Sequence, residues 1–176
     1  MSCAERKRDL AYNYQVGETI CSENDHILIA HFSPTGYFKQ TIYHPLALFA
    51  QNMRDGAAIR VSVKSPTFGG ETLPSWIGPI KGAPLDLDAS AVLVGRSLRL
   101  AVVNRSETKT YDVPLRIAFE KVTGEVTVHE LWHQDVTVRN GWGKEEEVSV
   151  KTKKADWTGR WTFREHSFTM FVFNLE

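Results

Sequence analysis

The sequence is poor in cysteine, since its 176 residues include only Cys3 and Cys21. A disulfide framework usually needs four or more cysteines, so we expect two free thiols. There is no net charge either: 21 basic residues balance 21 acidic ones, which gives no field to attract nucleic acid or an anionic membrane. No run approaches the roughly 18 apolar residues of a membrane span. The charged N-terminus has no apolar core, so no signal peptide is predicted and the localisation stays unknown.

The usual signatures of catalysis and cofactor binding are also missing: no nucleophile elbow, phosphate loop, dinucleotide fingerprint or metal-spaced cysteine pair occurs. One match exists, because His129-Glu130-Leu131-Trp132-His133 has the H-E-x-x-H pattern of zinc proteases. That chemistry requires a helix, whereas the preceding residues 124–128 alternate as in a strand. On a strand the two histidines lie about 13 Å apart, too far to share one zinc ion. We predict no catalytic, cofactor-binding or metal-binding residue.

What the sequence does contain is one convincing helix, predicted over residues 45–54. Pro45 suits a first helical turn, where its missing N–H is not needed. Asp55-Gly56 marks the end, because glycine is common just past a helix. Apolar residues recur at helical spacing in between, at Leu46, Phe49, Ala50 and Met53.

Strand patterns dominate the rest of the chain. The first is His26–Phe32, followed by a turn at 33–36, and Ala57–Val63 places Ile59, Val61 and Val63 on one face. A Pro- and Gly-rich loop spans 66–84. The later predicted strands are 90–94, 97–104, 112–118, 125–132, 147–151, 159–163 and 167–173. Short antiparallel strands at this spacing must stack to hide their apolar faces, which predicts a mainly β fold, an antiparallel, jelly-roll-like β-sandwich.

Four further features remain, and the first two have alternative interpretations. Trp76, Trp142, Trp157 and Trp161 form either a sugar-stacking platform or ordinary core packing. His44 either contacts a ligand at the helix entrance or serves in capping and packing. Glu145–Glu147 with the lysines of 151–154 indicate the solvated ends of a hairpin. The sequon Asn104-Arg105-Ser106 is expected to be fortuitous without a secretion signal.

Several segments in order resemble the α-L-arabinofuranosidases of glycoside hydrolase family 51, especially the fungal type. They are Ser33–Leu46 (SPTGYFKQTIYHPL), Ser65–Phe68, Leu98–Ser106 (LRLAVVNRS), Gly124–His129 (GEVTVH) and Arg164–Met170. The resemblance covers about residues 27–174. It implies a (β/α)₈ barrel followed by a C-terminal sandwich. Residues 57–176 then correspond to that sandwich, residues 26–56 to the last strand and helix of the barrel, and residues 1–25 stay unassigned.

The resemblance also implies an activity, the retaining hydrolysis of terminal arabinofuranosides in arabinan and arabinoxylan by two glutamates. Retention needs two carboxyl groups about 5–5.5 Å apart. In the family the acid/base follows an asparagine, and this chain has no Asn-Glu dipeptide. We therefore expect a catalytically incomplete C-terminal fragment with no cofactor, whose glycan partner acts through a catalytic domain. Leu46, Phe49 and Met53 are expected to form an exposed patch that favours self-association. A free-standing carbohydrate-binding sandwich is the alternative.

Overall fold

The structure is a computed structural model that describes residues 30–33, 36–67, 84–118, 122 and 124–175. The expectations for residues 1–25, both cysteines, Trp76 and most of the 66–84 loop therefore lie outside the described residues. Within them, no helix has the length and apolar character needed to cross a membrane.

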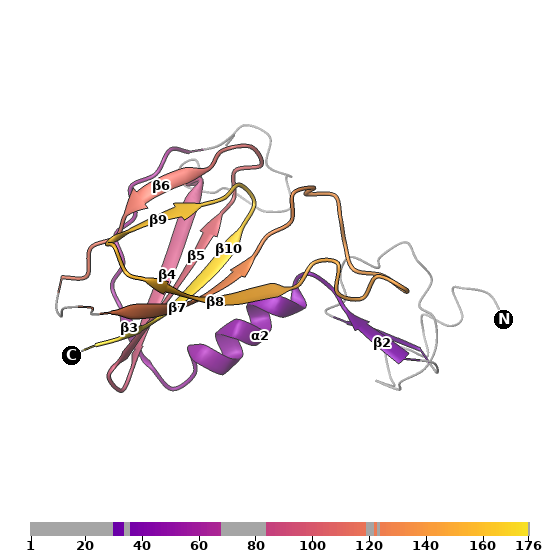
Figure 1. Cartoon of the computed structure of the whole chain (residues 1–176), viewed down its shortest axis with the longest axis horizontal. Coiled ribbons are helices and arrows are strands. Elements are labelled where there is room, and N and C mark those ends of the chain that lie inside the picture. Colours follow the sequence, from indigo (N-terminus) through magenta and orange to yellow (C-terminus); the bar gives the residue numbers. More distant parts are fainter. Residues whose placement is uncertain (1–29, 34–35, 68–83, 119–121, 123, 176) are drawn as a thin grey trace.

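Among the described residues, one helix, preceded by a short hairpin, is followed by strands alone (Figure 1). They are β1 (Ala30–Ser33), β2 (Gly36–Lys39), α2 (Tyr43–Asn52), β3 (Ala57–Ile59), β4 (Leu87–Val94), β5 (Ser97–Asn104), β6 (Tyr111–Pro114), β7 (Glu125–Leu131), β8 (Val150–Asp156), β9 (Arg160–Phe163) and β10 (Phe168–Asn174).

The main sheet has six antiparallel strands in the order β3-β4-β5-β10-β7-β8, and a second sheet pairs β6 with β9. The strand β10 lies in the middle, with Met170 opposite Ala101 of β5 on one side and His129 of β7 on the other. The strands β1 and β2 form a separate hairpin in which Ala30 pairs with Lys39. In Figure 1 the β6–β9 sheet lies on one side of the main sheet and α2 on the other.

The larger core fills the space between the two sheets. Alternate residues of β10 point into it, so that Phe171 and Phe173 are fully buried and meet Phe163 of β9. The ring of Phe171 contacts that of Phe163 edge-on at a centroid distance of 6.0 Å. Burying one such side chain contributes about 1.5–3 kcal/mol, so these aromatic residues hold the sandwich together. The predicted inward face of 57–63 is confirmed, since Ile59, Val61 and Val63 pack against this core.

A second, smaller core joins α2 to the opposite face of the main sheet. Leu48 is buried there against Phe168 and Met170 of β10, and Phe49 packs on the ring of Phe168 at 5.7 Å. The helix is confirmed, but it begins at Tyr43 and ends at Asn52, with Pro45 in its first turn.

The side chain of α2 that is buried is Leu48, which the sequence pattern did not single out, whereas Leu46 and Ala50 are exposed, because the position of the sheet and not the spacing alone selects the buried face. The helix ends just before Asp55-Gly56, where Asp55 has a left-handed φ of 60°.

Three predicted strands needed correction. The predicted strand 147–151 is replaced by β8 at 150–156, a lysine-rich edge strand paired on one side only, whose polarity hides the strand pattern. The ladder of β3 stops at Ile59, although the chain continues to cover the core. The strand β6 ends at Pro114, although the N–H of Leu115 still donates to the carbonyl of Gly159 at 2.9 Å.

Candidate functional site

The chain changes direction between the β1–β2 hairpin and α2, at residues 40–42. The N–H of Tyr43 donates to the carbonyl of Gln40 at 2.9 Å, and that of His44 donates to Thr41 at 3.3 Å. No side chain caps the helix, and its first turn contains no acidic residue. A backbone turn alone therefore starts α2.

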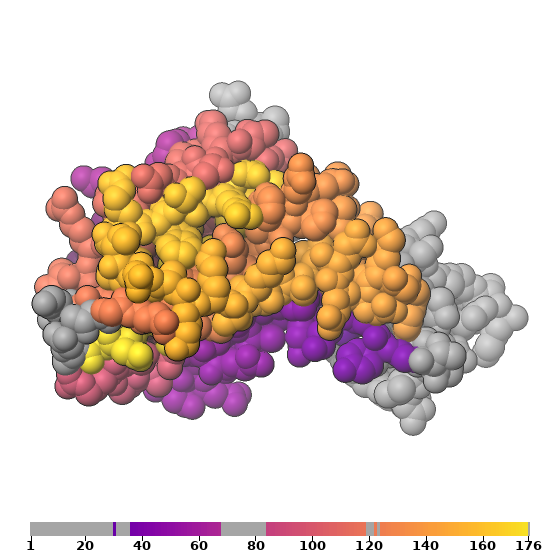
Figure 2. All heavy atoms as spheres, viewed as in Figure 1, coloured from indigo at the N-terminus to yellow at the C-terminus, as the bar shows by residue number. Residues whose placement is uncertain are grey.

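The long connection from β7 to β8, residues 132–149, is fixed against this turn by Asn140. Its side-chain Nδ2 donates to the carbonyls of Lys39 and Val148, each at 2.9 Å, and its Oδ1 accepts from the N–H of Val148 at 2.7 Å. In the same region Trp142 contacts the ring of Phe38 edge-on at 5.0 Å. In Figure 2 this orange segment lies against the indigo atoms of β2 and α2. The sequence gives no signal for this role of Asn140, because Asn140-Gly141 has the composition of an ordinary turn.

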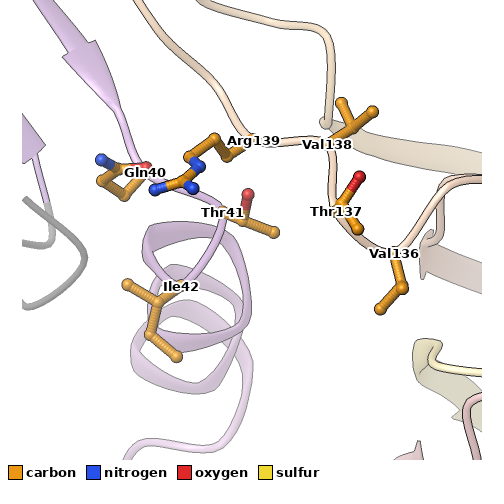
Figure 3. A pocket seen from close by; sticks show the side chains of 7 residues that line it. All are labelled: Gln40, Thr41, Ile42, Val136, Thr137, Val138 and Arg139. Carbon is orange, nitrogen blue, oxygen red and sulfur yellow. The ribbon is translucent and has the colours of Figure 1, made fainter.

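A cleft of about 590 Å³ lies where these two segments meet (Figure 3). Gln40, Thr41 and Ile42 form one wall, and residues 136–139 form the other. Figure 3 shows the guanidinium of Arg139 extending towards the Gln40 side. The described residues that line this cleft include no carboxylate.

Exposed apolar side chains gather around this cleft. Among the described residues, the large hydrophobic side chains that are clearly exposed all lie within 37–46 and 136–142. We call this set the junction surface: Tyr37, Ile42, Leu46, Val136 and Trp142. Leu46 is 46% exposed, as expected, but Phe49 and Met53 are partly buried against the second core. The predicted patch is thus displaced towards the start of the helix.

The H-E-x-x-H sequence begins on a strand, as predicted, and continues beyond the strand end. His129, Glu130 and Leu131 belong to β7, and His133 follows the strand end. The Nδ1 atom of His129 is 2.8 Å from Oγ1 of Thr152, whereas Nδ1 of His133 is 3.1 Å from the N–H of Asp135, which donates to it. The helical arrangement that the zinc-protease motif requires is therefore not present in this segment.

The described tryptophans do not share one surface. Trp157 and Trp161 pack edge-on against Phe171 and Phe173 of the larger core. Trp142 is 52% exposed and belongs to the junction surface. These contacts favour the packing interpretation for Trp157 and Trp161.

Asn104 of the sequon is 1% exposed and has a structural role. Its Nδ2 donates to the carbonyls of Lys109 and Arg164, each at 2.8 Å, and its Oδ1 accepts from the N–H of Ser106 at 3.0 Å. The acceptor nitrogen of the sequon is thus already engaged. Glu145–Glu147 and Lys151, Lys153 and Lys154 are exposed, as expected for solvated loop and strand ends.

Burial changes the titration of two histidines. Burial, and then the positive charge of Lys39, lower the pKa of His44, which favours packing of this side chain beside the helix start. Burial, and then Arg99, lower the pKa of His129. On the other side of the sandwich, the hydroxyl of Tyr111 donates to buried Asp86, which raises the pKa of Tyr111 to about 12.

Comparisons with known proteins agree on one family. Residues 21–167 match the family model described as the α-L-arabinofuranosidase C-terminal domain. A probable α-L-arabinofuranosidase C of Aspergillus clavatus is 38% identical over 142 residues, which are 80% of this chain and 27% of that protein. The α-L-arabinofuranosidase C of Emericella nidulans is 36% identical over 136 residues, 77% of this chain and 26% of that protein.

Solved structures agree on the fold. An α-L-arabinofuranosidase from Thermotoga maritima, in complex with arabinose, has a TM-score of 0.68 at 22% identity and covers 83% of this chain and 31% of its own. A family 51 arabinofuranosidase from Xanthomonas axonopodis pv. citri has a TM-score of 0.64 at 16% identity, with 83% of this chain and 28% of its own covered. The predicted β-sandwich is confirmed. The chain spans about 27% of the length of the curated relatives.

Proposed function

Because the chain belongs to the α-L-arabinofuranosidase C-terminal domain family, we propose that it is the accessory sandwich of such a glycoside hydrolase and is not active alone. The junction surface carries this proposal, because Ile42, Leu46, Val136 and Trp142 expose apolar area that contact with another part of the enzyme would bury. The residues that line the junction cleft include no carboxylate, and the chain has no Asn-Glu pair. Both observations support catalysis by another part of the enzyme.

The proposed division assigns residues 26–56 to the end of a catalytic barrel and residues 57–176 to the sandwich. The helix α2 supports it by having two apolar sides: Leu48 is buried on the sandwich, whereas Ile42 and Leu46 are exposed. Helices of a (β/α)₈ barrel form an outer ring and can be contacted on both sides. In this proposal the exposed side of α2 faces the catalytic part, which would act on arabinose-containing glycans.

The activity is tested with the purified chain and 4-nitrophenyl α-L-arabinofuranoside. We expect no release of 4-nitrophenol above that of buffer, while an intact α-L-arabinofuranosidase serves as the positive control. Release that rises in proportion to the concentration of this chain, and that arabinose inhibits, would refute the proposal of inactivity.

The junction surface is tested by the association state of the isolated chain. Without its partner the chain should self-associate through this patch, and Leu46→Glu should return it towards the monomer in light scattering. Ala50→Glu is the matched control, because Ala50 is exposed on the same helix but presents little apolar area. A wild-type chain that is already monomeric at high concentration would contradict this role.

The alternative, a free-standing module that stacks sugars on tryptophans, has less support. Trp157 and Trp161 are used in the core, and Trp142 is the one described tryptophan that is largely exposed. A single exposed indole beside other apolar side chains fits a protein contact better than a platform.

A further inference from the structure

A second hollow, of about 530 Å³, lies on the sandwich itself, away from the residues of the junction cleft. Its walls come from β7 and the edge strand β8 of the main sheet and from the β6–β9 sheet. We call it the edge groove. Its lining residues are Asp112, Glu130, Lys153, Thr158, Arg160, Trp161, Thr162 and Arg164. A volume in this range is typical of small-molecule sites.

Glu130 is the unusual member, because it is a carboxylate with only 9% of its surface exposed. It points to the same side of β7 as Val126 and Val128, towards the space between the sheets. Its Oε2 is 3.7 Å from Nζ of Lys153, which is an ion-pair distance but too long for a hydrogen bond. The carboxylate therefore has room to accept further hydrogen bonds, and a ligand that brings O–H groups could donate to it.

The aromatic faces next to the groove are already covered. The ring of Trp161 meets Phe171 edge-on at 5.1 Å, and Nζ of Lys153 lies 5.1 Å from its centroid. The guanidinium carbon of Arg164 lies over the ring of Trp132, 4.3 Å from its centroid. A ligand of this groove must therefore be recognised by hydrogen bonds and not by stacking on these rings.

The groove holds charges of both signs. Arg160 donates to Asp112 at 2.7 Å, and Lys153 is near Glu130, whereas Arg164 makes no ion pair with a carboxylate among the described residues. An inorganic anion would be repelled by Glu130, and a cation would be repelled by Lys153 and Arg164. An apolar ligand would remove water from these charged side chains without replacing the lost hydrogen bonds. A hydroxyl group both donates and accepts, so adjacent hydroxyls satisfy both kinds of side chain.

We propose that the edge groove binds a neutral saccharide, whose hydroxyls donate to Glu130 and accept from Lys153 and Arg164. This site is separate from the catalytic proposal, since a chain with no hydrolase activity can still bind a saccharide here. Failure of one proposal therefore leaves the other standing.

The test is a titration of the full chain with a neutral arabinoxylo-oligosaccharide, followed by the NMR signal of the Trp161 indole N–H. We expect a saturable shift, and Glu130→Gln should weaken binding about tenfold or more, because it removes a charged acceptor. Glu125→Gln is the matched control: Glu125 is on the same strand but exposed and paired with Lys154, so affinity should not change.

Three outcomes would overturn the proposal. The first is no saturable shift with the oligosaccharide, and the second is binding that Glu130→Gln leaves unchanged. The third is tighter binding of inorganic phosphate, which would make the groove an anion site. If Glu130→Gln lowers the melting temperature too far for a titration, Arg164→Gln decides instead. Arg164 is exposed, so this variant should fold, and unchanged affinity in it would also count against the proposal.

Discussion

Leu48→Ala tests whether α2 is held by the sandwich. Leu48 is 7% exposed and packs in the second core with Phe168, Met170 and Leu131. Removing a buried leucine side chain costs about 2–5 kcal/mol, depending on how far the cavity collapses. The helix lies on the outside of the sheet and can move inwards, so we expect a loss of about 3 kcal/mol. Leu46→Ala, on the exposed side of the same helix, should change stability by less than about 0.5 kcal/mol.

Urea unfolding, followed by tryptophan fluorescence, measures both variants. With a slope of about 2 kcal/mol per molar urea, Leu48→Ala should lower the midpoint by about 1.5 M. Trp157 and Trp161 report on the larger core, so their signal follows the sandwich and not only the helix. Equal midpoints for the two leucine variants would show that α2 is not stabilised by this contact, and the described second core would then be wrong.

Three other substitutions or conditions give further tests. The pKa values of His44 and His129 are lowered from 6.5 in the folded state, so the unfolded chain binds more protons just below pH 6.5. The contribution of these histidines to stability should therefore be complete above pH 6.5 and decrease as the pH falls below it. The double variant His44→Gln, His129→Gln should flatten this part of the pH profile of the melting temperature. Asn104→Asp would place a carboxylate against the carbonyls that Asn104 now donates to, and should cost about 3 kcal/mol or more in urea unfolding; a cost below about 1 kcal/mol would contradict this hydrogen-bond role. In Gly56→Ala the new Cβ would lie 2.9 Å from Cγ2 of a valine and 3.1 Å from a backbone carbonyl of β4, so the melting temperature should fall by the equivalent of about 1–3 kcal/mol.

Periodicity predicted most of the sandwich because its strands alternate strongly. In β5 one face carries Leu98, Leu100 and Val102, and in β10 residues 170–173 are all apolar; the structure places these strands at the centre of the main sheet. The edge strand β8 was displaced in the prediction because Lys151, Lys153 and Lys154 weaken the apolar signal. A strand with one neighbour needs fewer apolar residues, so its sequence contains less information about its bounds.

The sites were harder to predict than the strands, because each depends on contacts between distant segments. Leu48 and Leu46 are equally apolar, and only the position of the sheet decides which of them is buried. Glu130 belongs to a fortuitous metal motif in the sequence, and its inward direction follows only from the position of β7 beside β8 and opposite β9. Asn140 has no sequence pattern that announces three hydrogen bonds to two segments.

The central place of β10 has a consequence for splitting the protein in two. Its partners β5 and β7 have no ladder with each other, so a chain cut before Phe168 would keep the β3-β4-β5 and β7-β8 portions on either side of a gap one strand wide. A synthetic peptide with the sequence of β10 would regain both ladders and return Phe171 and Phe173 to the larger core. The sandwich is thus suited to two-component complementation, in which a short peptide binds a larger, incomplete partner and restores its fold.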